Sequence, residues 1–130
     1  MTPQTTPFHL DRYRWKNRLL LVFAPASSSE DYQRQKTLLA DCSQALKARD
    51  LLIVEVFVTD TSTLDGQPLS AEDAARLGVR FAVAPKEFAV LLIGKDGTVK
   101  RRDRQPIQPS DLFSTIDAMP LRQHELAAER

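Results

Sequence analysis

The chain has 130 residues, of which 42% are apolar and 27% charged, a balance typical of one soluble globular domain. Its formal net charge of +1 gives no general attraction to nucleic acid or to an anionic membrane, so neither is expected as a partner. No apolar run approaches the roughly 20 residues of a membrane span, and a single cysteine, Cys42, excludes both an intramolecular disulfide and a CxxC redox site.

Residues 1–7 lack hydrophobic periodicity and are predicted to form a flexible leader, with order beginning near Phe8. Residues 8–126 are predicted to form one domain, and residues 127–130 a C-terminal tail. The N-terminal stretch has no apolar core of signal-peptide length, so the sequence as it stands predicts a cytoplasmic protein. A leader removed before this sequence begins would instead indicate a periplasmic or secreted protein.

Two continuous apolar runs predict central strands that are covered on both faces. The first is residues 19–23, and the second is LLIVEVFV at residues 51–58. Between them, apolar residues recur with helical spacing and predict one helix over residues 30–47. Two strands joined by such a helix are expected to run parallel.

Three serines lie between the first strand and this helix. Ser27 with Glu30, or Ser28 with Asp31, has the spacing of a capping box, so a capping role is expected. A catalytic serine would need a partnered base. The two histidines of the chain lie in terminal segments whose position the pattern does not define, so catalysis by these serines is the weaker interpretation.

Residues 59–69 are rich in turn formers and are predicted to form a surface loop. A short helix is expected from Ala71 to Leu77, capped by Ser70 and ended by Gly78. The stretch FAVLLIG, a turn at Asp96-Gly97, and the stretch TVKRR together predict an antiparallel hairpin.

Pro109 is expected in the first turn of a helix that continues to about Ala118, where Pro120 stops it. The remaining tail is helical by propensity but too short to be stable unless it docks. The whole order predicts an α/β fold of thioredoxin-like type, with a mixed sheet of four to five strands and helices on both faces.

Three stretches resemble thioredoxin: VFAP at residues 22–25, LGV at 77–79 and LLIGKDGTV at 91–99. The resemblance places the thioredoxin cysteines at Ser27 and Glu30, so no dithiol exists. Peroxiredoxins need a cysteine in the first turn of the first helix and an arginine at about the place of Phe88. The resemblance therefore implies the fold without either catalytic site, and Cys42, on the buried side of its helix, is expected to be an inert thiol.

The blocks RWKNRLLLVFAP, LLIGKDGTVKRR and IDAMPLRQHE resemble a peroxiredoxin-like domain-of-unknown-function family. That family occurs as a standalone bacterial protein and as domains of sushi-repeat-containing and coiled-coil-domain-containing extracellular proteins of vertebrates. The resemblance implies a thioredoxin-like fold without the catalytic cysteines and with no established activity.

Two basic stretches could form a small anion site. Before the first strand stand Arg14, Trp15, Lys16 and Arg18, and after the hairpin turn stand Lys100, Arg101, Arg102 and Arg104. These residues would meet if the two segments were close, with Trp15 as a stacking face. The alternative is that charge protects a sheet edge against aggregation. The helix N-terminus at Ser27 and Ser28 is a second, weaker place for an anion.

Glu55 is the one carboxylate within the second apolar strand. Unpaired burial of a carboxylate is costly, so pairing with Arg14, Lys16 or Arg102 is expected. The weaker alternative is that Glu55 is a functional acid in a binding site. Arg122 is expected to cap carbonyl groups or to pair with an acid.

These patterns predict a redox-inactive thioredoxin-like binding or interaction module whose partner is a protein or a small anionic ligand. The alternative is an atypical thioredoxin- or peroxiredoxin-like enzyme that uses Cys42 or the serines near Ser27. Neither a cofactor nor a metal is expected, and a homodimer formed through the exposed sheet edge is left open.

Overall fold

The computed structural model of the protein describes residues 9–128. The predicted leader, Phe8, and the last two residues of the predicted tail lie outside the described residues. In chain order the elements are η1 (Leu10–Tyr13), β1 (Arg18–Ala24), α1 (Glu30–Leu39), α2 (Ser43–Ala48), β2 (Leu51–Phe57), β3 (Thr63–Leu64), β4 (Gln67–Pro68), α3 (Ala71–Arg80), β5 (Ala89–Ile93), β6 (Val99–Asp103), α4 (Pro109–Asp117) and α5 (Pro120–Ala128).

One mixed sheet organises the chain, with the strand order β4-β3-β2-β1-β5-β6. The central strand β1 runs parallel to β2 and antiparallel to β5, and β5 and β6 form the predicted hairpin. The predicted α/β class with a mixed sheet is confirmed, although the sheet has six strands rather than four to five.

The additional strands come from residues 59–69, which were predicted to be a surface loop. Asp65 and Gly66 have φ values of 49° and 83° and connect β3 to β4 as a two-residue turn. Asp-Gly is a preferred pair for such a turn, because both central residues need positive φ. The prediction was wrong because the flanking strands have only two residues each, which leaves no alternating pattern to read.

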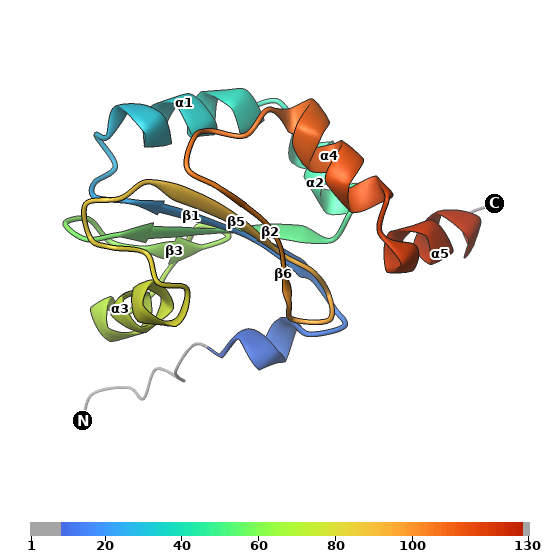
Figure 1. The fold of residues 1–130 in the computed structure, drawn as a ribbon, viewed down its shortest axis with the longest axis horizontal. Coiled ribbons are helices and arrows are strands. Elements are labelled where there is room, and N and C mark those ends of the chain that lie inside the picture. The colour runs from blue at the N-terminus through green and yellow to red at the C-terminus, as the bar shows by residue number, and fades with distance from the viewer. Residues whose placement is uncertain (1–8, 129–130) are drawn as a thin grey trace.

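Helices cover both faces of the sheet (Figure 1). The helices α1, α2 and α4 lie on one face, and α3 and η1 lie on the other. Every residue of β1 is buried, and its side chains alternate between the two cores, with Leu20 and Val22 in one and Leu19 and Leu21 in the other. Among residues 9–128, no helix combines the length and apolar character needed to cross a bilayer.

The single helix predicted over residues 30–47 is wrong, because the chain breaks it into α1 and α2. At the break, Ala40 N–H donates to Thr37 O and Cys42 N–H donates to Leu39 O, so tighter turns replace the α-helical hydrogen bonds. Leu39 and Leu46 nevertheless pack into the same core. The apolar spacing therefore continues across the break and could not reveal it.

The predicted helix cap at Ser70 is confirmed, since its hydroxyl accepts a hydrogen bond from Asp73 N–H at 3.0 Å. The predicted end at Gly78 is wrong, because α3 continues to Arg80. Val83 N–H donates to Gly78 O and Ala82 N–H to Val79 O, with Ala82 at a φ of 54°. This is a Schellman ending in which alanine takes the left-handed position that glycine usually occupies.

Pro109 begins α4 as predicted, but Pro120 begins α5 as well as following α4. Proline is tolerated there because the first helical N–H has no partner within the helix. The tail predicted to be helical therefore forms α5, which extends beyond the end of the sheet in Figure 1.

Candidate functional site

The connection from β1 to α1 occupies the place where the thioredoxin resemblance puts the reactive cysteine. Neither predicted capping box forms there, because Ser29 is the residue that precedes α1. Its hydroxyl accepts a hydrogen bond from Ala26 N–H instead of capping the helix. Ser28 is exposed, and Ser27 is half-buried.

Ser27 is held by Asp60, which follows β2. Its main-chain N–H donates to Asp60 Oδ2 at 2.7 Å, and this bond is the main reason why the pKa of Asp60 is lowered. A carboxylate with a lowered pKa is a weak base, so it is poorly suited to activate a serine hydroxyl. Within residues 9–128, neither histidine hydrogen-bonds to Ser27, so the elements of a serine nucleophile do not come together here.

Asp60 also lines a groove of about 820 Å³ on the α3 side of the sheet. Its lining includes the face of α3 that carries small residues and the connection from β2 to β3. Two apolar residues that line it are unusually exposed to solvent: Val58 is 61% exposed and Val79 is 83% exposed. We call this the α3 groove, lined by Phe23, Ala24, Val56, Phe57, Val58, Thr59, Asp60, Thr61, Ser62, Leu69, Ala71, Ala74, Ala75, Gly78, Val79, Ala82, Val83, Ala84, Pro85 and Glu87.

Glu55 does not pair with Arg14, Lys16 or Arg102, so that expectation was wrong. Its carboxylate accepts hydrogen bonds from the Tyr32 hydroxyl and, at 3.0 Å, from the Thr63 hydroxyl. Burial and then the Glu55 carboxylate raise the pKa of Tyr32, which keeps its hydroxyl protonated as the donor. Thr63 belongs to the strand that sequence reasoning did not find, and this explains why the partner was missed.

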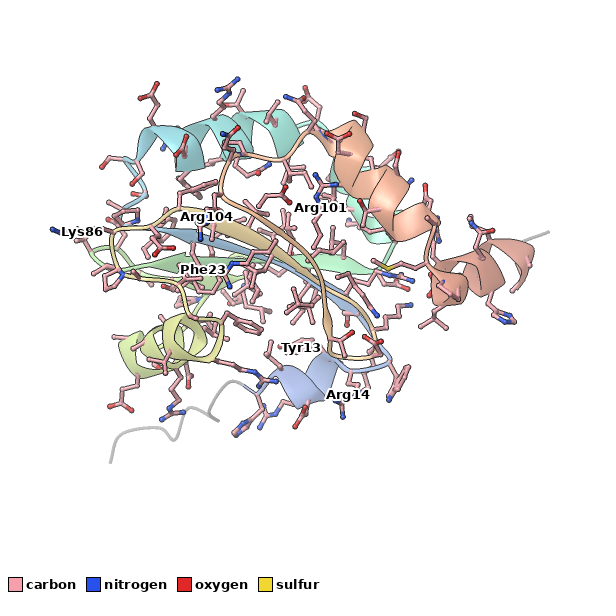
Figure 2. All side chains as sticks on the ribbon, in the orientation of Figure 1. Tyr13, Arg14, Phe23, Lys86, Arg101 and Arg104 are labelled. Atoms are coloured by element: carbon pink, nitrogen blue, oxygen red, sulfur yellow. The ribbon has the colours of Figure 1, made fainter. Side chains whose placement is uncertain are left out.

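The predicted basic site is divided between two places. Arg14 Nε donates to Asp96 O at 3.1 Å, and Figure 2 shows Arg14 beside η1, near the β5–β6 turn. Trp15 and Lys16 are exposed beside it. Arg102 instead donates to Phe81 O and to Ala82 O, where it covers the end of α3. The structure therefore does not bring Arg102 to the other three residues.

Arg122 is buried, and it both caps a carbonyl group and pairs with an acid, as expected. Its guanidinium donates to Ala48 O at 3.1 Å and to Asp117 at 3.2 Å. It is one member of a larger network, the C-terminal ion network, that ties α5 to the start of β1 and to the end of β5. The members are Arg18, Arg49, Asp50, Lys95, Asp117, Arg122 and Glu125.

Glu125 lies at the centre of this network. Its two carboxylate oxygens accept hydrogen bonds from the Arg18 guanidinium at 3.1 and 3.2 Å, and one also accepts a bond from Lys95 at 2.7 Å. Burial alone would raise the pKa of Glu125, but the bonds from Arg18 and Lys95 outweigh burial and lower it. The carboxylate is therefore held in its charged form.

Comparison with known proteins places the chain in a family. The family model described as "Domain of unknown function (DUF4174)" matches residues 9–125. The chain belongs to the DUF4174 family. As a DUF4174 domain it contains the whole C-terminal ion network and both sides of the α3 groove within the matched residues.

Relatives of this DUF4174 domain include much longer proteins. It is 32% identical to sushi repeat-containing protein SRPX2 of Xenopus laevis over 91% of the chain, and 27% identical to coiled-coil domain-containing protein 80 of Danio rerio over 98% of the chain. The chain spans only 26% of the first of these relatives and 17% of the second.

Solved structures similar to the DUF4174 domain have thioredoxin-type folds. A reduced 2-Cys peroxiredoxin of Plasmodium vivax matches 90% of this chain and 84% of that chain with a TM-score of 0.67 and 16% identity. An exposed lipoprotein thioredoxin of Streptococcus pneumoniae matches 86% of this chain and 91% of that chain with a TM-score of 0.60 and 12% identity. At these identities the likeness establishes the fold alone, and it confirms the predicted thioredoxin-like class.

The single cysteine of this DUF4174 domain lies away from the β1–α1 connection. Cys42 directly precedes α2, is half-buried, and has its Sγ 3.8 Å from Leu38 O. It packs against the core that α1, α2 and α4 cover. Its expected position within a continuous helix was wrong, whereas the expected packing against that core is observed.

Proposed function

We propose that this DUF4174 domain is a binding module without thiol redox activity, and that its α3 groove receives an apolar peptide segment carrying one positive charge. One observation carries the proposal: the groove opens beside the Ser27–Asp60 pair, at the position where the resemblance puts a reactive cysteine. A thioredoxin-type scaffold without a thiol at that position keeps a surface that can hold a chain but lacks the atom that would exchange electrons with it.

The composition of the groove supports this choice of partner. Exposed Val58 and Val79 form part of an apolar surface whose contact with water is unfavourable. Such a surface is typical of an interaction site. Among the described residues that line the groove, the charged ones are Asp60 and Glu87, and both are acids. A partner with a lysine or arginine among apolar side chains would complement this arrangement.

Peptide binding tests the groove. We expect a labelled synthetic peptide, in which leucine and valine flank one lysine, to bind saturably in a fluorescence anisotropy titration. Val79→Arg should weaken this binding at least about tenfold, because it places a cation in the groove and removes apolar contact. Replacing the lysine of the peptide by norleucine should weaken it by a smaller factor.

Val99→Arg is the matched control, because Val99 is also exposed but lies on β6, outside the α3 groove. Equal affinities for the two variants, or equal affinities for the lysine and norleucine peptides, would contradict the proposed partner. Both substitutions are at exposed positions, so circular dichroism should confirm that each variant is folded.

Redox inertness is tested separately. We expect neither reduction of insulin disulfides nor consumption of hydrogen peroxide above the rate of a buffer blank, since Cys42 is a single half-buried thiol. Cys42→Ser should leave peptide binding unchanged. Turnover that Cys42→Ser abolishes would instead favour an atypical enzyme that uses this thiol.

A further inference from the structure

A second cavity, of about 520 Å³, lies near the β5–β6 turn, away from the α3 groove. Figure 2 shows that the two regions lie apart. Arg14 lies beside the β5–β6 turn, and Lys86, next to groove residue Glu87, lies at the other end of the sheet. We call this cavity the Trp15 cleft. The lining residues that matter here are Trp15, Arg18, Lys95, Lys100, Met119 and Leu121.

Arg18 has a polar atom without a partner. Its side chain is 1% exposed, and its two terminal nitrogens bind Glu125 and Arg49 O, but its Nε has no hydrogen-bond partner within the described part of the chain. A buried donor without an acceptor is rare and costs free energy, so a binding partner that supplies an acceptor would be favoured. Arg18 lines the cleft, which has room for such a partner.

The charges beside the cleft favour an anion as that partner. The C-terminal ion network holds four cations, Arg18, Arg49, Lys95 and Arg122, but only three carboxylates, Asp50, Asp117 and Glu125. At the rim, Lys100 is paired with Asp96 and therefore leaves this excess of one positive charge unchanged. An anion in the cleft would lie next to a network that carries one net positive charge, in a partly desolvated place.

Trp15 gives the cleft an aromatic wall. Its side chain is 65% exposed, although its main-chain N–H is fixed by a bond to Lys95 O and its φ is 69°. A bulky residue in the left-handed region is unusual, and it persists only where surrounding contacts hold it. Met119 and Leu121 contribute apolar surface from the α4–α5 junction.

We propose that the Trp15 cleft binds a small organic anion in which a carboxylate is attached to a flat apolar body. Oxygen atoms of the carboxylate would accept hydrogen bonds from Lys100 and from Arg18 Nε, a buried atom that would turn toward the cleft on binding, and the flat body would lie against Trp15 and Met119. This site does not depend on the α3 groove, and a single domain could hold a peptide and an anion together.

Fluorescence of Trp15, the single tryptophan of the chain, reports on the cleft directly. A titration with sodium benzoate at constant ionic strength should change the emission saturably. Benzamide, which has the same ring without the charge, should cause no saturable change, and acetate should bind at least about tenfold more weakly. In a proton–nitrogen correlation spectrum, the Nε–H signal of Arg18 should shift with the same dissociation constant.

Lys100→Gln should weaken benzoate binding about fivefold, since it removes one partly exposed cation from the rim. Lys86→Gln, which removes an exposed cation far from the cleft, should leave binding unchanged. The proposal fails if benzoate gives only linear quenching, if benzamide binds equally well, if the Arg18 signal does not move, or if the two variants bind equally. Lys100 is outside the C-terminal ion network, so the Lys100→Gln variant should remain folded. Its affinity for benzoate therefore tests the cleft and not the stability of the fold.

Discussion

Glu125→Ala is expected to lower the free energy of unfolding by about 3 kcal/mol, because it leaves the buried cations of Arg18 and Lys95 with too few carboxylates. Glu125 is only 22% exposed, so water can compensate little of this loss. Urea unfolding followed by circular dichroism measures the change. Glu72→Ala is the matched control, since Glu72 pairs with Arg76 at 3.9 Å in an exposed position and should contribute well under about 1 kcal/mol.

The same carboxylate should make stability depend on pH. The folded pKa of Glu125 is lower than its unfolded pKa, so its contribution is fully present above the unfolded pKa of about 4.3 and is lost as the pH falls through the folded pKa. The unfolding free energy of the wild type should therefore fall with acidification below about pH 5. Glu125→Gln should show a shallower fall over this range. A variant that matches the wild type in both stability and pH profile would show that the network contributes nothing measurable.

Gln35→Met is expected to lower the free energy of unfolding by about 2–4 kcal/mol, although methionine has a similar volume and is more apolar. The buried Gln35 amide donates to Ile107 O at 3.1 Å and accepts from Ile107 N–H at 2.8 Å. Both main-chain groups of Ile107 would lose their side-chain partner next to the core. Urea unfolding measures the effect.

Gln44→Met provides the comparison, since Gln44 is exposed on α2 and should change stability by less than about 0.5 kcal/mol. If Gln35→Met were as stable as the wild type, the two hydrogen bonds to Ile107 would be replaceable by apolar packing alone. Intrinsic helix propensity cannot explain a difference between the two variants, because glutamine is replaced by methionine in a helix in both cases.

The long elements could be predicted from sequence because each has a strong local pattern. The β1 run, the β5–β6 hairpin and the Ser70 cap depend on apolar spacing or turn residues within a few positions. The split between α1 and α2 could not be predicted, since its cause is a local change in hydrogen bonding that leaves the apolar spacing intact. The pair Asp65-Gly66 is typical of a tight turn and could have indicated the β3–β4 hairpin. The flanking strands are too short to show the alternating pattern that would confirm such a turn from sequence.

Candidate site residues were harder to predict because their partners are distant in sequence. Arg18 and Glu125 are separated by 107 positions, and no spacing rule joins them. Gln35 could have been found, since it is three positions after Tyr32 and four before Leu39 on the buried side of α1. Arg102 was assigned to the wrong place because a basic residue on a strand can point to either face of the sheet, and here it binds the end of α3.

Both margins of the sheet resist the addition of a foreign strand. At one margin, β4 offers only Gln67 and Pro68, and proline has no N–H to donate to a newcomer. At the other, β6 carries Lys100, Arg101 and Arg102 in succession, and charged side chains on an edge strand disfavour pairing with another strand. We therefore expect little aggregation of the folded domain through strand pairing at these edges.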